Sequence, residues 1–128
     1  MTTTTRSFIS KKRAMHYFSV GQKAHRFMQL KTHKPGKATL GKELFRFGYS
    51  ERFLYSLAKL PIAFTRDEYL RWLHTVDAGQ LVLVAGLKRE VNRQRMLKRL
   101  GSRHVPFRVA EELVREARRR EKARRQKD

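Results

Sequence analysis

Apolar side chains recur every three or four residues along residues 12–30, which is the spacing of one face of an α-helix. The basic side chains of this segment fall outside that face. We therefore expect an amphipathic basic helix, weakened at Gly21 because glycine is a poor helix former. An extended start at 2–10 and a loop at 31–41 would flank it. The apolar face would consist of Tyr17, Val20, Ala24, Phe27 and Met28.

The middle of the chain has the pattern of short helices joined by short connections. Ser50 is placed to cap a helix with apolar side chains at positions 53, 54, 57 and 58, which ends near Pro61. Thr65 and Glu68 have the spacing of a capping box, in which each side chain hydrogen-bonds the backbone amide of the other residue. The helix that this box opens would carry Tyr69, Trp72, Leu73 and Val76 on one side.

Residues 77–100 predict one continuous helix, which opens at a second, weaker capping box formed by Asp77 and Gln80. Residues 81–87, LVLVAGL, are apolar all round, so a buried strand is the alternative for this short run. We prefer the helix because the cap and the pattern that follows agree with it. Gly101 would end it, since glycine is common just beyond a helix.

A last helix is expected from Pro106 onward, because proline suits the first turn of a helix. Its apolar stripe fades into a cationic tail, which would continue as an exposed helix. In the tail, glutamates among the arginines indicate ordinary solvated helix faces with ion pairs one turn apart. The stripe is Val109, Ala110, Leu113, Val114 and Ala117.

These elements predict a mainly α fold, with a small helical body, an extended basic N-terminal arm and a basic C-terminal helix. The length of the chain suits one domain. Residues 1–42 would be the arm with its amphipathic helix. Residues 43–112 would be the helical body, divided into a neutral core at 43–87 and a basic helix at 88–103. Residues 113–128 would be the basic tail helix.

The formal net charge of +20 is concentrated at the two ends of the chain. Residues 1–42 contain ten Lys and Arg and no Asp or Glu. Residues 43–87 balance five basic against five acidic residues, and residues 88–128 hold sixteen basic against six acidic ones. Such concentrated charge repels itself unless a polyanion or an anionic surface neutralises it. Lysine and arginine that neutralise phosphates release counterions, so the distribution favours nucleic acid as the partner.

Aromatic residues interleave with the cations, and such rings can stack on unpaired bases, which favours RNA over DNA. The rings at positions 45, 47 and 49 alternate, however, and would equally suit packing on the helical core. The candidate RNA-contacting residues are Arg6, Lys11, Lys12, Arg13, Lys23, Arg26, Lys31, Lys34, Lys37, Lys42, Lys88, Arg89, Arg93, Arg95, Lys98, Arg99, Arg103, Arg118, Arg119 and Arg120.

Little in the sequence points to catalysis, and we expect no enzyme, no cofactor and no small-molecule substrate. Residues 36–42 match the G-x-x-x-x-G-K pattern of a phosphate loop, but Glu43 stands where Ser or Thr would hold magnesium. The five histidines show no paired ligand spacing and there is no cysteine, so no metal site is expected. The acids mostly stand at helix starts, where they complement backbone dipoles.

Small size, basic ends and a modest neutral core resemble ribosomal proteins as a class, without the motif of a named family. We therefore expect a structural constituent of a ribosome that binds rRNA and neighbouring ribosomal proteins. Residues 1–30 are rich in Thr, Ser, Arg and Lys and lack acids, which is typical of a targeting segment and favours a mitochondrial ribosome in the matrix. A cytoplasmic or plastid ribosome is the alternative location.

Two other functions stay open from the sequence. One is a non-catalytic accessory subunit of a mitochondrial inner-membrane complex, since cationic amphipathic helices also bind anionic membranes. Membrane contact is the weaker expectation, because the first helix offers Tyr17, Phe18 and Phe27 rather than Trp and Leu. The other is a helix-turn-helix-like DNA-binding protein across residues 65–100, although its basic residues come late for a base-reading helix.

Overall fold

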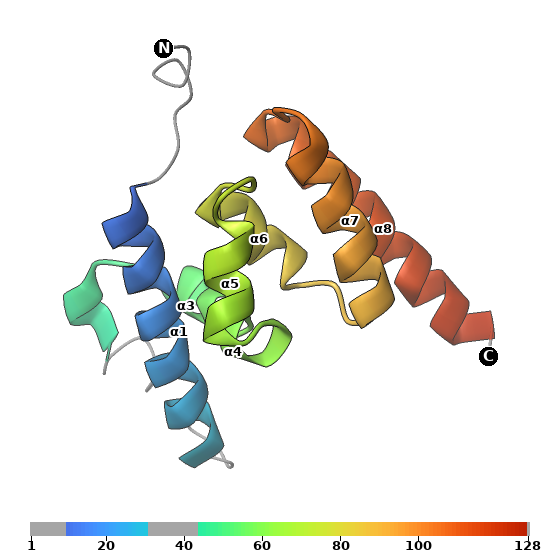
Figure 1. Ribbon diagram of the computed structural model, residues 1–128. Coiled ribbons are helices and arrows are strands. Elements are labelled where there is room, and N and C mark those ends of the chain that lie inside the picture. Colours follow the sequence, from blue (N-terminus) through green and yellow to red (C-terminus); the bar gives the residue numbers. More distant parts are fainter. Residues whose placement is uncertain (1–9, 31–43, 128) are drawn as a thin grey trace, which may run out of the picture.

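The computed structural model of the chain describes residues 10–30 and 44–127, and every regular element in these ranges is a helix (Figure 1). The mainly α fold expected from the sequence is confirmed. The expected loop at 31–41, and the extended start apart from Ser10, lie outside the described residues. The elements are α1 (Lys11–Leu30), the 3-10 helix η2 (Phe45–Phe47), α3 (Glu51–Leu57), α4 (Leu60–Ala63), α5 (Arg66–Trp72), α6 (Ala78–Val84), α7 (Glu90–Ser102) and α8 (Phe107–Lys127).

The helices form one body around one hydrophobic core. Helix α1 lies along one side of the molecule, α7 and α8 lie at the opposite side, and α3 to α6 fill the space between them (Figure 1). Leu57 of α3, Leu81 of α6 and Leu97 of α7 are completely buried, as is Ala110 of α8. The same core therefore extends from the first helix to the last.

Helix α1 buries the apolar face that its periodicity predicts, and it packs across α3 and α4. Tyr17, Val20 and Ala24 are buried, and Phe27 and Met28 are partly buried against the core. Ala14 and Phe18 widen this buried face. Apolar packing thus crosses the boundary that charge suggests at residue 42, and helix α8 likewise runs without a break across the one suggested at residue 112.

Gly21 lies where α1 approaches α3 most closely, and the approach requires a residue without a side chain. A Cβ atom built at this position would overlap the backbone carbonyl of Leu57 and lie 3.4 Å from Cδ of Pro61. The sequence marked Gly21 as a weak point of the helix. The structure shows that it is also the contact that lets α1 join the core.

The two local caps of the middle segment are confirmed. Ser50 accepts a hydrogen bond from the amide of Phe53 at 3.1 Å and begins α3. Thr65 and Glu68 form the reciprocal capping box of α5, with amide-to-side-chain distances of 2.8 and 3.1 Å. Pro61, expected to end that helix or to follow it closely, follows α3 and lies in the first turn of α4, where a missing amide hydrogen costs nothing.

Tyr69 ties α5 to α1 from inside the core. Its side chain is completely buried, and its hydroxyl donates a 2.7 Å hydrogen bond to the carbonyl oxygen of Ala14. Burial raises the pKa of Tyr69 far above the usual range, followed by smaller contributions from Tyr17 and Asp77. The phenol therefore stays protonated at neutral pH and donates the hydrogen bond to Ala14.

The single helix expected over residues 77–100 is wrong, and so is the strand alternative for residues 81–87. Helix α6 ends at Val84, the chain turns, and α7 begins at Glu90. The two segments need different surroundings, since α6 is buried nearly all round whereas α7 keeps a cationic face in water. A turn between them satisfies both needs, and Arg93 closes it by donating to the carbonyls of Leu87 and Lys88 at 2.8 and 3.1 Å.

Two further local expectations are wrong, the capping box of Asp77 with Gln80 and the helix end at Gly101, and tertiary contacts are found at both places. Asp77 is the N-cap of α6 but its side chain makes no capping hydrogen bond there. Gln80 is buried and donates to the carbonyl of Val105 at 2.7 Å instead of closing a box. Gly101 lies inside α7, against the Thr75 hydroxyl, rather than beyond its end. Pro106 directly precedes α8, and its carbonyl accepts from the amide of Ala110.

Candidate nucleic-acid interface

The structure places the sequence-predicted cations in separate groups. Those of α1 are exposed on one side of the molecule: Lys11, Lys12, Arg13, Lys23 and Arg26. Those of the second half lie around the α6–α7 turn, along α7 and on α8, at the opposite side (Figure 1). Outside the described residues lie Arg6, Lys31, Lys34, Lys37 and Lys42.

A groove of about 700 Å³ runs between the α6–α7 turn and α8, and cationic side chains line almost all of it. We call it the α8 groove. Lys59, after α3, lies near two residues of this groove: partial burial lowers the pKa of Lys59, and the charges of Arg118 and Lys88 lower it further. Its lining residues are Gly86, Lys88, Arg89, Arg115, Arg118, Arg119, Glu121, Lys122 and Arg124.

The cations of α8 reach the groove because of their spacing. Arg115, Arg118, Arg119 and Lys122 stand at i, i+3, i+4 and i+7, so they share one face of the helix. Two ion pairs join described residues, Arg115 with Glu112 at 3.5 Å and Arg120 with Glu116 at 3.6 Å. Both are exposed, and such pairs contribute little. Within the described part of the chain, neither joins Arg118, Arg119 or Lys122, whose charge is left for a partner.

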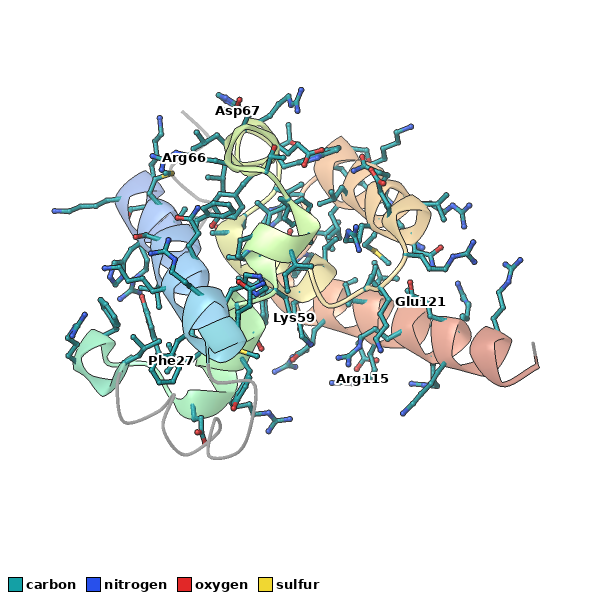
Figure 2. All side chains as sticks on the ribbon, turned by 90° about the horizontal axis from the view of Figure 1, so that it is seen from below. Phe27, Lys59, Arg66, Asp67, Arg115 and Glu121 are labelled. Atoms are coloured by element: carbon teal, nitrogen blue, oxygen red, sulfur yellow. The ribbon has the colours of Figure 1, made fainter. Side chains whose placement is uncertain are left out.

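Glu121 holds the α6–α7 turn against α8 (Figure 2). One carboxylate oxygen accepts from the amide of Lys88 at 3.0 Å, and the other accepts from the amide of Arg89 at 3.0 Å and from Nδ2 of Asn92 at 2.7 Å. Only 9% of the residue is exposed. The sequence had suggested that the glutamates of the tail were solvated, and for Glu121 this is wrong.

Glu121 supplies the hydrogen-bond acceptor that the first turn of α7 lacks. The N-cap of α7 is Arg89, which makes no side-chain cap, so the first amides lack a local acceptor. A carboxylate also interacts favourably with the positive end of the helix dipole. The lack of a capping side chain at Arg89 was the one sign in the sequence that a distant residue accepts hydrogen bonds from these amides. Because Glu121 is that acceptor, Lys88 and Arg89 lie beside the cations of α8.

Hydrogen bonding keeps Glu121 ionised in the folded protein. Burial raises its pKa, but the hydrogen bonds from Asn92, Lys88 and Arg89, together with the charge of Arg89, outweigh burial. The pKa therefore lies below the ordinary value of 4.5. The stability that this carboxylate contributes is complete above that ordinary value and is lost as the pH falls through the folded-state pKa.

Replacing Glu121 with Gln is expected to lower the free energy of unfolding by about 2 kcal/mol at neutral pH, because it removes hydrogen bonds to a charged acceptor. The gap between variant and wild type should narrow as the pH falls below 4.5 and through the lowered folded-state pKa, because the wild-type carboxyl then also becomes protonated. Urea unfolding at neutral pH and along a series of falling pH values measures both effects. Glu116→Gln is the matched control, since Glu116 is exposed one turn earlier on α8. Equal losses in the two variants would contradict the role of Glu121.

Other sequence-predicted cations do not enter the groove. Arg93 is committed to the carbonyls of the α6–α7 turn, and Arg120 pairs with Glu116. On α7, Arg95 and Lys98 are exposed outside the groove lining. A smaller hollow of about 360 Å³ is lined by Arg99, Ser102, Arg103, Val105, Val109 and Leu113.

The end of α8 near this hollow exposes apolar side chains. Val109, expected in the apolar stripe of the last helix, is 46% exposed, and neighbouring Phe107 is 49% exposed. Ala110 and Val114 are buried as expected, and Leu113 and Ala117 pack against the core from its edge. The buried stripe of α8 is therefore narrower than the sequence suggests.

The described residues contain no group of three or more His, Asp or Glu side chains that could hold a metal ion. Among the helices of this part of the chain, none is long and apolar enough to cross a membrane. Protein-family models, curated proteins and solved structures were compared with the chain, and none of them matches it. The function must therefore be argued from the geometry and charge of its surface.

Proposed function

We propose that the protein is a non-catalytic RNA-binding protein and a structural constituent of a ribosome. The observation that carries this proposal is the α8 groove, where seven cationic side chains from two segments meet. The one carboxylate among them, Glu121, already accepts three hydrogen bonds from the protein. The groove therefore has a large positive charge that its own residues leave unneutralised.

A ribose-phosphate backbone fits the chemistry of this groove. Lysine and arginine supply donors for phosphate oxygens, and neutralising phosphates releases counterions into solution. No aromatic side chain is among the residues that line the groove, so it offers no ring on which an unpaired base could stack. It is suited to holding folded RNA by its backbone, which is what a structural component of a ribosome does.

The arrangement of α7 speaks against the helix-turn-helix hypothesis. Helices of that class present their N-terminal residues to base edges in the major groove. The start of α7 instead faces Glu121 of α8, whose carboxylate binds the amides of Lys88 and Arg89. The first turn of α7 is therefore packed against α8 rather than free to enter a major groove.

The mitochondrial ribosome is the setting that the N-terminal composition supports. Residues 1–30 combine Thr, Ser, Arg and Lys with a complete lack of acids, as targeting segments do. The exposed apolar side chains at Phe107 and Val109 suit contact with a neighbouring ribosomal protein. The partners in this proposal are rRNA and neighbouring ribosomal proteins.

The test is sedimentation of the tagged full-length protein from cells and from isolated mitochondria. We expect the protein at ribosome density, and we expect ribonuclease digestion to move it to the top of the gradient. The physical reason is that its contacts are to phosphates. Sedimentation with membranes that survives ribonuclease and ends on adding detergent would contradict the proposal and favour the inner-membrane complex.

A further inference from the structure

A second surface with unusual side chains lies on the far side of the molecule from the α8 groove. There η2 lies beside α1 at the outer edge of the body (Figures 1 and 2). Three partly exposed rings follow one another in the segment from η2 into α3, at Phe47, Tyr49 and Phe53. They pack against one stripe of α1 that carries a histidine and two cations. We call Arg13, His16, Lys23, Arg46, Phe47 and Tyr49 the cation–aromatic ridge.

The inner rings of this surface are fixed by ring-to-ring contacts. Tyr49 lies 5.9 Å from Tyr17 and 5.2 Å from Phe53 between centroids, both edge to face. The Tyr49 hydroxyl is 3.1 Å from Nδ1 of His16. Gly48, at φ +80°, reverses the backbone so that the residues on either side of it can both face α1. The Tyr49 ring is thus held in place by Tyr17, Phe53 and His16.

Phe47 is placed differently, because its neighbours are cations. Nζ of Lys23 lies 5.4 Å and Cζ of Arg46 lies 4.9 Å from the centroid of its ring, and His16 meets it edge to face at 5.6 Å. Both Lys23 and Arg46 are exposed. An exposed cation–π contact is weaker than the stacking of a base on an aromatic ring. A base can therefore displace these long side chains from the ring and leave their charges beside its own phosphates.

We propose that the cation–aromatic ridge binds an unpaired RNA segment, with one base stacked on Phe47 and the flanking phosphates on Lys23 and Arg46. This deepens the RNA-binding function proposed above and rests on it. Positive charge combined with a supported ring is the arrangement that sequence-tolerant single-strand binding uses. The α8 groove has no aromatic ring in its lining, so in this proposal the ridge binds unpaired RNA and the groove binds paired RNA.

The experiment compares two RNAs on the purified full-length protein by fluorescence anisotropy. One is an unstructured oligouridine of eight nucleotides, and the other is a blunt RNA duplex. Phe47→Leu keeps an apolar side chain against α1 but removes the ring. We expect it to weaken oligouridine binding about tenfold, as the loss of one base–ring stack should, and to leave duplex binding unchanged. Phe47→Trp should restore binding, and its fluorescence should be quenched by the stacked base.

A second variant protects the test against misfolding. Lys23→Gln combined with Arg46→Gln leaves every ring in place. We expect it to weaken oligouridine binding by about twenty-five-fold at 0.1 M salt, since each lost phosphate contact costs a factor of about five, while the melting temperature stays constant. Unchanged oligouridine binding in both variants would overturn the ridge proposal even if the duplex binds. Equal losses for the two RNAs in both variants would also overturn it. Failure of the wild type to bind either RNA would instead overturn the RNA-binding function itself.

Discussion

Replacing Arg118, Arg119 and Lys122 together with Gln is expected to weaken duplex RNA binding by about a hundredfold at 0.1 M salt. Each neutralised phosphate adds roughly 0.7–0.9 to the slope of log affinity against log salt, which corresponds to a factor of about five to eight at that concentration. Three contacts multiply to about a hundredfold or more. The slope itself should fall by about two to three. Titrations between 50 and 300 mM salt measure both quantities.

The control must remove the same charge from another place. Arg52 of α3 and Arg66 and Arg71 of α5 are exposed, and none of them lines the α8 groove. The triple variant with Gln at these positions has the same net charge as the groove variant. We expect its affinity to change less than threefold or so, because charges beyond about one Debye length from the RNA are screened. Equal losses in the two variants would mean that net charge binds RNA and that the groove has no special role.

Gly21→Ala is expected to lower the free energy of unfolding by about 3 kcal/mol, although alanine is the better helix former by about 1 kcal/mol. The new methyl group would overlap the carbonyl oxygen of Leu57, which belongs to a backbone that cannot rotate away. Helix α1 must then move off α3 and α4, and the core beneath it opens. Thermal unfolding followed by circular dichroism should show a melting temperature lower by roughly 10 °C or more.

Gly101→Ala provides the matched comparison, since it is the same change inside another helix. A Cβ at Gly101 would meet the Thr75 hydroxyl at 3.0 Å, and a side-chain rotation can relieve that contact. We expect the melting temperature of this variant to stay within a few degrees of the wild type. A Gly21→Ala protein as stable as Gly101→Ala would show that α1 does not need its close approach to α3.

Sequence alone was sufficient wherever the determining interaction is local. The caps at Ser50 and at Thr65 with Glu68 span three residues, and all three side chains form the hydrogen bonds expected of them. The apolar face of α1 was readable for the same reason, because periodicity follows from the helix itself. Such features are complete within one turn or one helix, so no knowledge of the fold is needed to predict them.

The errors fall where a distant residue decides the outcome. Gln80 was assigned to a local box, but its partner is the carbonyl of Val105, 25 residues away. Glu121 was assigned to solvent, but it caps a helix whose N-cap, Arg89, lies 32 residues before it. A single sequence records neither contact. The break between α6 and α7 also depends on tertiary surroundings, since α6 is buried whereas α7 keeps a cationic face in water, and so it was missed as well.

The candidate site was predictable in part. Of the four cations on the groove face of α8, Arg118 and Arg119 were expected from the sequence, whereas Arg115 and Lys122 were not, although helical spacing places them on the same face. That Lys88 joins this face is a tertiary result, since the turn carrying it is fastened by Glu121. The set of RNA-contacting residues expected from the sequence was also too large, because the Arg93 side chain donates to the backbone carbonyls of the α6–α7 turn. Charge density favours a polyanionic partner, whereas the fold decides which cations lie together.

The placement of α1 and α8 on opposite sides of the body has a further consequence. A layer of helices separates them, so two steps of about 8–10 Å between packed helix axes put them roughly 16–20 Å apart, beyond the screening length of about 8 Å at physiological salt. With both surfaces occupied, the protein is a bridge of fixed length between two stretches of RNA. Once one end is bound, the other searches only a small volume, and its local concentration rises accordingly. The rigid core thus acts as a spacer that sets how closely two RNA elements can approach.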